Sequence, residues 1–424
     1  MKNSVRNDFQ PVREVGAGAI RRRHIIYAEA YDPRGPKWYF DLFQRTCDRF
    51  QELWPVTLTL QPLEMASADF AHWRVDARGL AWQVTTHYDF LRLESFVQSE
   101  MARPTAWQLI RGSGWLVGDV LSGAQFRMFR ASWRFDLHLL YFQGLLVAWL
   151  AVPALFAVLV ARTATHWLNW SVPLGVITAL LAAIVALFAL RPVADRSHVL
   201  LFSSCWASLR RFGRGRPTWL DHAIDVGARR VIEVAQANEA DELAVVGHST
   251  GGVTASAIMA RALELNPDLG RSGPRLVLLT LGSVMPGVAL HPAAQRMRNI
   301  IKRLATEPSL SWIDCQSGKD VLCFANFDSV EGSGVHVGAQ RRNPLLWQIS
   351  FKEMISPEEY RSFRQNRIRV HFQYIMAGDR PAPYDFIWVA AGPMPIAEWP
   401  KRHEELKNEF LQKSLAMNVA TTTL

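Results

Sequence analysis

Cysteine is scarce in this chain, with four residues among 424 and no Cys-x-x-Cys spacing. Closely spaced cysteines or histidines are typical of structural zinc, and larger cysteine sets are typical of small disulfide-stabilised secreted domains. The sequence has neither pattern, so we expect no metal site, no cofactor, and reduced thiols that are mostly buried. The four residues are Cys47, Cys205, Cys315 and Cys323.

A secretory signal is also missing, because residues 1–23 contain no apolar stretch. Basic residues outnumber acidic ones, with 47 Lys and Arg against 38 Asp and Glu. The arginine clusters are short, however, and they lack the interleaved aromatic residues of nucleic-acid-binding segments. We therefore expect a folded cytosolic domain with no nucleic-acid partner, whose excess positive charge faces solvent or lipid.

Two apolar runs in the middle of the chain, residues 139–161 and 167–190, contain no charged side chain. Each is long enough to cross about 30 Å of hydrocarbon as an α-helix, although a buried hairpin of a soluble protein is the alternative. By the positive-inside rule, the flanking charge predicts a two-pass membrane protein with both long segments in the cytoplasm, at the inner membrane if the source is bacterial. The flanking arginines are Arg127, Arg130, Arg134, Arg191 and Arg196, and the short connection has only Arg162 beside it.

Strand and helix patterns alternate on both sides of the apolar runs, which predicts an α/β fold with a mostly parallel sheet. After a flexible leader over residues 1–20, we expect one domain in two parts, residues 21–135 and 192–424. Residues 136–191 are then a transmembrane hairpin inserted within the sheet. The predicted strands include residues 23–28, 56–60, 70–75, 80–86, 243–246, 275–281, 310–314 and 367–370, and a helix is predicted over residues 253–265.

The segment 247–252 reads Gly-His-Ser-Thr-Gly-Gly, between a predicted strand and a predicted helix. A serine hydroxyl needs a base to remove its proton and donors to stabilise the oxyanion that forms. Flanking glycines permit a sharp turn that exposes the serine, and the helix N-terminus supplies backbone N–H groups. The segment resembles the α/β-hydrolase superfamily, in the Gly-His-Ser-x-Gly-Gly version of its lipases and esterases. We expect Ser249 to be a nucleophile, against the alternative of a plain glycine-rich turn.

The resemblance implies that the acid and then the histidine follow the serine along the chain. Asp320 lies in a loop similar to the one where the family places its carboxylate, with Asp314 and Asp328 as alternatives. His371 begins His-Phe-Gln-Tyr, which resembles the His-x-x-Tyr segments of several hydrolases. The competing base is His336, in a glycine-rich segment.

The resemblance also implies an oxyanion hole made by the N–H of Thr250 and an N–H from the loop near residue 31, where we assign Tyr31. The His-Gly of the family is absent from that loop, which reads Glu-Ala-Tyr at residues 29–31. His248 is expected to be a packing residue.

The predicted function is a membrane-anchored serine hydrolase that cleaves carboxylic esters, lipid esters among them, through an acyl-enzyme on Ser249. Its partners are then a small-molecule or lipid ester substrate and membrane lipids. An acyltransferase that uses the same triad, and a non-catalytic membrane-bound scaffold with a hydrolase fold, are the alternatives.

Overall fold

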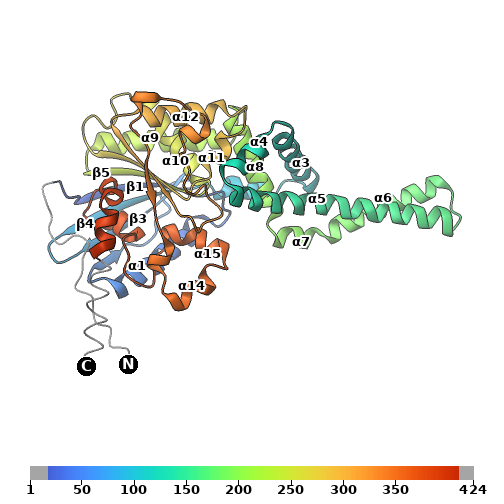
Figure 1. Ribbon diagram of the computed structural model, residues 1–424, viewed down its shortest axis with the longest axis horizontal. Helices are drawn as coiled ribbons and strands as arrows, with labels where there is room; N and C mark the ends of the chain where they lie inside the picture. The colour runs from blue at the N-terminus through green and yellow to red at the C-terminus, as the bar shows by residue number, and fades with distance from the viewer. Residues whose placement is uncertain (1–17, 410–424) are drawn as a thin grey trace. The chain divides into compact units, whose positions relative to one another are not determined.

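The computed structural model describes residues 18–409, which form two compact units (Figure 1). The chain passes from the first unit to the second after Val97 and returns to the first at Phe212. The first unit is therefore built from both ends of the chain, and the second is an insertion. This insertion is longer than the hairpin predicted over residues 136–191. The leader predicted over residues 1–20 falls mostly on residues 1–17, which lie outside the described residues.

One eight-stranded sheet organises the first unit, in the order β2-β3-β4-β1-β5-β6-β7-β8. Its pairings are parallel from β4 through β8, while β3 is antiparallel to both β2 and β4. The α/β fold with a mostly parallel sheet, built from strands on both sides of the insertion, is thus confirmed. The strands are β1 Arg22–Ala28, β2 Thr57–Leu60, β3 Phe70–Arg78, β4 Gln83–Leu91, β5 Glu242–His248, β6 Arg275–Leu281, β7 Leu310–Gln316 and β8 Leu345–Gln348.

Helices cover both faces of this sheet, with α9, α10 and α12 on one face and α1, α14 and α15 on the other (Figure 1). Every residue of β5 is buried, as expected for a parallel strand between two helical layers. The helices of this unit include α1 Gly35–Leu53, α9 Leu220–Ala237, α10 Gly251–Leu265, α11 Met285–Ala289, α12 Gln295–Thr306, α13 Phe351–Met354, α14 Pro357–Phe363, α15 Arg367–Phe372 and α16 Phe386–Ala391.

Two local predictions were wrong. The strand predicted over residues 367–370 is the short helix α15, whose N-terminus is capped by the Asn366 side chain accepting a hydrogen bond from the Arg369 N–H at 2.9 Å. The strand predicted over residues 70–75 is longer, because β3 continues to Arg78.

A buried ion pair ties the centre of the sheet to the C-terminal part of the unit. Arg23 on β1 donates to the Glu242 carboxylate on β5 at 2.7 Å, and both side chains are buried. The same guanidinium donates to the carbonyl oxygens of Gly392 and Met394, and Glu242 accepts from the Ile396 N–H. Because these groups satisfy one another, residues 392–396 are fixed against the sheet.

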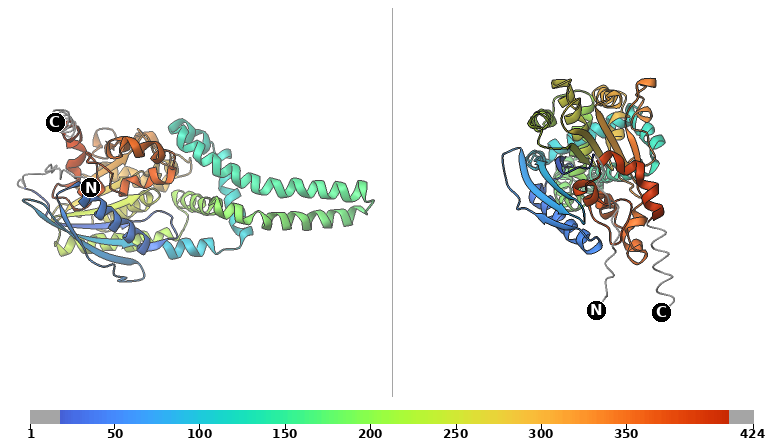
Figure 2. Two further views of the ribbon diagram at one scale, coloured as in Figure 1. Left: turned by 90° about the horizontal axis from the view of Figure 1, so that it is seen from below. Right: turned by 90° about the vertical axis from the view of Figure 1, so that its left-hand side faces the viewer.

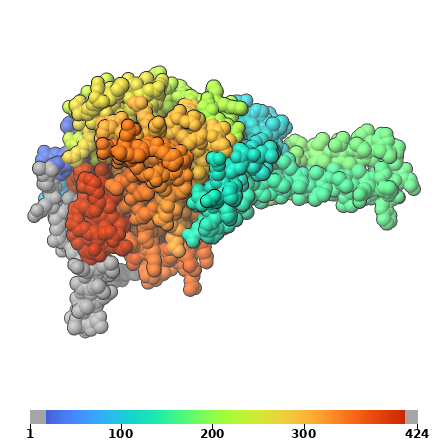
Figure 3. Space-filling model, turned by 45° about the horizontal axis from the view of Figure 1, so that its top comes forward, coloured from blue at the N-terminus to red at the C-terminus, as the bar shows by residue number. Residues whose placement is uncertain are grey.

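The second unit is helical, and two of its helices are long and apolar enough to cross a membrane. In the most apolar stretch of each, 17% and 11% of the residues are buried, whereas a core helix of a soluble protein is mostly buried. The two helices run side by side (Figure 2), and their exposed surface is visible in Figure 3. The helices are α3 Thr105–Leu121, α4 Ala124–Ala131, α5 Trp133–Arg162, α6 Val172–Ala189, α7 Arg191–Arg196 and α8 Val199–Gly213, and α2 Glu94–Met101 crosses the boundary between the units.

Candidate functional site

Ser249 occupies the turn between β5 and α10, with a backbone φ of 59°. Residues other than glycine rarely adopt this left-handed backbone conformation, so contacts with the surrounding structure must stabilise it. The Ser249 N–H donates to the carbonyl oxygen of Leu281 at 2.9 Å, and the Ser249 carbonyl accepts from the Gly252 N–H at 3.1 Å. The serine therefore stands half-buried, at the end of the sheet where the parallel strands finish.

Two glycines of this turn have no room for a side chain. A Cβ on Gly247 would lie 2.3 Å from the carbonyl oxygen of Gly251, so the strand and the helix approach each other closely. A Cβ on Gly251 would lie 2.2 Å from the carbonyl oxygen of Ala28, the last residue of β1. The turn is thus packed against β1 as well as between β5 and α10.

His371 and Asp320, which both belong to the first unit, form a buried pair. The His371 Nδ1 lies 2.7 Å from the Asp320 Oδ2, and the other carboxylate oxygen accepts from the Leu322 N–H at 2.8 Å. Since the carboxylate is acceptor-only, it fixes the proton of a neutral imidazole on Nδ1 and leaves Nε2 as a base. The predicted acid and histidine, 51 residues apart in the chain, are brought together.

His248 links this pair to the serine turn. Its Nε2 donates to the His371 carbonyl oxygen at 2.9 Å, and the two rings lie 4.6 Å apart between centroids. Complete burial, with the nearby His371, lowers the pKa of His248 well below its usual range, so the ring is neutral. The residue before Ser249 is therefore hydrogen-bonded to the backbone of the residue that pairs with Asp320.

The alternative acids and the alternative base lie in different surroundings. Asp314 is buried and accepts hydrogen bonds from Thr280, Gln316 and Ser329, which leaves no histidine contact among the described residues. Asp328 pairs with Arg341 at 2.6 Å. His336 is exposed and has no carboxylate partner in the described part of the chain.

The two predicted oxyanion donors contact each other. Thr250 is the N-cap residue of α10, and its Oγ1 accepts a hydrogen bond from the Tyr31 N–H at 2.7 Å. The loop between β1 and α1 is thus adjacent to the serine turn, as the assignment requires. In this arrangement the Tyr31 N–H is directed at the threonine hydroxyl.

Sequence reasoning missed two charged features of that loop. Glu29 is buried, and its Oε1 accepts from the Leu93 N–H at 2.8 Å, which ties the loop to the end of β4. Arg34 binds Asp32 and places its guanidinium 3.5 Å from the centre of the Trp38 ring. The Asp32–Arg34 pair flanks Pro33 and was visible in the sequence, whereas the partner of Glu29 is 64 residues away in the chain.

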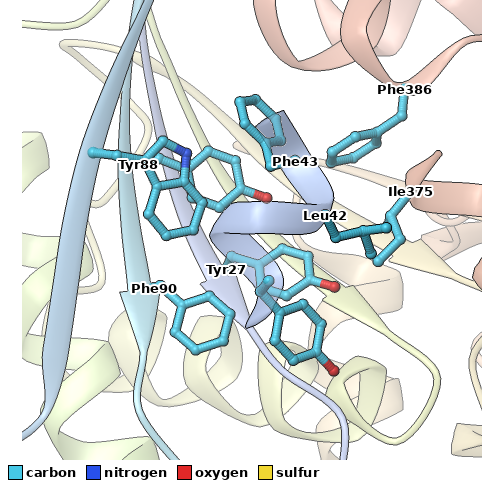
Figure 4. Close-up of a pocket in the computed structure, with 9 residues that line it drawn as sticks. Tyr27, Leu42, Phe43, Tyr88, Phe90, Ile375 and Phe386 are labelled. Atoms are coloured by element: carbon cyan, nitrogen blue, oxygen red, sulfur yellow. The ribbon is translucent and has the colours of Figure 1, made fainter. Parts of the chain in front are cut away.

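One small cavity lies in the aromatic core behind β1 (Figure 4). Its volume is about 20 Å³, which is room for one water molecule and not for an ester substrate. We therefore assign it to packing. The lining residues are Tyr27, Tyr39, Leu42, Phe43, Trp73, Tyr88, Phe90, Ile375 and Phe386.

Comparison of the chain with protein-family models, curated proteins and solved structures found no match. Function must therefore be inferred from the fold and from the geometry of the site.

Gly251→Ala is expected to destabilise the first unit by at least about 3 kcal/mol, because the new methyl group meets backbone atoms of β1 that cannot move independently. Thermal unfolding of the purified protein measures this effect. The matched control is Gly318→Ala, where no atom lies within 4 Å of the added Cβ. Equal stability of the two variants would contradict the close packing of the turn.

Glu29→Gln is expected to change the pH dependence of stability. Burial, together with the nearby Glu94 and Asp32 carboxylates, raises the pKa of Glu29 well above its usual range. The folded protein then keeps a proton that the unfolded chain loses, so this contribution is present below the ordinary pKa of glutamate and is lost as the pH rises towards the folded value.

The amide introduced by this substitution remains neutral and can still accept from the Leu93 N–H. Unfolding temperatures at about pH 5, close to the ordinary pKa of glutamate, and at about pH 8, well above it, should therefore differ less in Glu29→Gln than in the wild type. Glu64→Gln, at an exposed position, should leave the wild-type difference unchanged. A wild-type pH dependence in Glu29→Gln would refute the buried, protonated state.

Proposed function

We propose that this protein is a serine hydrolase of α/β-hydrolase type, anchored in a membrane by α5 and α6. The observation that carries the proposal is the position of Ser249: it has a left-handed backbone in a strand-to-helix turn, and His248 beside it is bonded to the His371 of a His–Asp pair. A left-handed serine between a strand and a helix is typical of a nucleophile elbow, and the nearby His–Asp pair supports His371 and Asp320 as its base and acid.

In the proposed mechanism, Ser249 Oγ attacks the carbonyl carbon of an ester while His371 Nε2 accepts the hydroxyl proton. Asp320 orients the ring through Nδ1 and stabilises the imidazolium that forms. The proton then passes to the alcohol leaving group, and an acyl-enzyme remains on Ser249. Water attacks this ester with His371 as base, which releases the carboxylic acid and restores the serine.

The tetrahedral oxyanion requires donors that are in place before the reaction. The Thr250 N–H at the start of α10 is the first, supported by the partial positive charge of the helix N-terminus. Tyr31 supplies the second N–H from the loop after the strand next to β5, which is the kind of loop that α/β hydrolases use. Because that N–H is bonded to Thr250 Oγ1, the hydroxyl must rotate away before Tyr31 can bind the oxyanion.

Membrane anchoring is supported by the length, composition and exposure of α5 and α6. Apolar side chains such as Leu155, Leu180 and Phe188 are exposed along both helices, as expected for surfaces that face lipid. A hydrolase held at a membrane meets substrates that partition into it, so we assign lipidic esters as the substrate class.

Fluorophosphonate labelling of the detergent-solubilised protein tests the nucleophile. The wild type is expected to be labelled and Ser249→Ala is not, while Ser362→Ala, at an exposed position on α14, keeps wild-type labelling. An unlabelled wild type with a normal unfolding transition would favour the scaffold alternative. Labelling of Ser249→Ala at the wild-type level would reject Ser249.

Turnover of a chromogenic ester tests the base and the acid. His371→Ala and Asp320→Asn are each expected to lower kcat by roughly 10⁴-fold, since the ring is then lost or misoriented. His336→Ala is expected to retain nearly full activity because that side chain is exposed and lacks a carboxylate partner among the described residues. A severe loss in His336→Ala and a mild one in His371→Ala would reassign the base.

Reporter fusions test the two-pass topology. A reporter that is active only outside the cytoplasm should be active when fused after Thr165, in the connection between α5 and α6, and inactive when fused after Leu424. Two inactive fusions would contradict the membrane hairpin.

A further inference from the structure

The helix α3 exposes an apolar face. Ile110, Val117 and Leu121 are 73%, 50% and 81% exposed, and their spacing places them on one side of the helix. Leu109 and Trp115 are buried on the opposite side. An exposed apolar stripe on a helix whose other face is already packed indicates a surface that contacts something less polar than water.

The next helix, α4, continues this surface and adds positive charge. Phe126 and Phe129 are 63% and 46% exposed, and each is followed by an exposed arginine, Arg127 and Arg130, while Met128 is fully buried. The Arg130 guanidinium lies 5.9 Å from the centre of the Phe126 ring. Arginines interleaved with exposed aromatic rings are typical of helices that lie at the lipid–water boundary.

The positive charge on this surface is not compensated. Residues 98–211 contain ten arginines, no lysine and four acidic residues. Three of these acids, Glu100, Asp119 and Asp136, are buried. Within residues 18–409, neither Arg127 nor Arg130 forms an ion pair with an acidic side chain. The two guanidinium groups are therefore available to an external anion.

The surface lies at one end of the apolar hairpin. α4 packs against α5, which begins two residues after α4 ends. Trp133 at the start of α5 is 54% exposed. The uncharged part of α5 starts at Leu139, so α4 stands about where phospholipid headgroups would surround a membrane-spanning α5.

We propose that α4 and the exposed face of α3 form an interfacial surface that binds anionic phospholipids. The Phe126 and Phe129 rings lie at the boundary of the acyl chains, and Arg127 and Arg130 bind headgroup phosphates. The inference rests on the proposed membrane anchoring by α5 and α6. A second copy of the chain is a poorer occupant, because the same positive surface on both copies would be opposed across the interface.

The binding test uses the full chain in detergent, titrated with phosphatidylglycerol or phosphatidylcholine and monitored by native mass spectrometry. Arg127→Gln/Arg130→Gln is expected to weaken phosphatidylglycerol binding by roughly 25-fold, or about 5-fold for each arginine, and to leave phosphatidylcholine binding unchanged. The matched control is Arg45→Gln/Arg229→Gln, which removes two exposed arginines of the first unit. Equal losses in the two double variants, or no loss in either, would overturn the proposal.

The location test uses spin labels on the full chain in vesicles of phosphatidylcholine and phosphatidylglycerol. The four native cysteines are buried, so labelling is directed to Phe129→Cys on α4 or Leu155→Cys on α5. The α4 label is expected to be more accessible to dissolved oxygen than to a water-soluble nickel chelate. It should lie at a shallower depth in the bilayer than the α5 label.

An α4 label in water together with an α5 label in the bilayer would overturn the interfacial surface and leave the anchor intact. Both labels in water would overturn the anchor itself. Disulfide formation between two Phe129→Cys copies, with both reagents excluded, would assign the surface to self-association and overturn lipid binding.

Discussion

The close approach of Gly251 to the carbonyl oxygen of Ala28 is the constraint on which the rest of the site depends. It presses the first turn of α10 against the end of β1, so the left-handed Ser249 is fixed relative to two neighbouring strands. The same contact brings Thr250 to the loop after β1, where its hydroxyl meets the Tyr31 N–H. Because Gly251 has no side chain, α10 can approach β1 closely, and this approach fixes the serine and both proposed oxyanion donors relative to β1.

Much of the fold around this constraint was predictable from local pattern. Continuous apolar runs identified β5 and β6 because central parallel strands are buried on both faces. Short strands were harder: β8 has four residues and only one of them, Trp347, is buried, so it has no recognisable period. α15 was predicted as a strand because Arg367–Val370 alternates polar and apolar residues, but Ile368 is exposed and Asn366 caps a helix.

The residues of the candidate site also differ in how well the sequence alone predicts them. Ser249 was predictable because the glycines that surround it are consecutive in the sequence, and their requirement is local. The pairing of His371 with Asp320 is a tertiary contact, so the sequence could offer only an order along the chain and a resemblance. The burial of Glu29 and the proposed interfacial surface of α3 and α4 were not predicted, since both depend on which side chains folding buries and which it leaves exposed.

The place of the inserted unit sets the order in which a growing chain can fold. β1 to β4 leave the ribosome first, then α5 and α6, and only afterwards β5 with its serine. Until then β1 has an unpaired edge, and Arg23 lacks the carboxylate of Glu242. In the proposed topology the hairpin enters the membrane before β5 to β8 have been synthesised. Under both proposals, Ser249 reaches its turn only in a chain that is already tethered, so no active form of the protein would precede insertion into the bilayer.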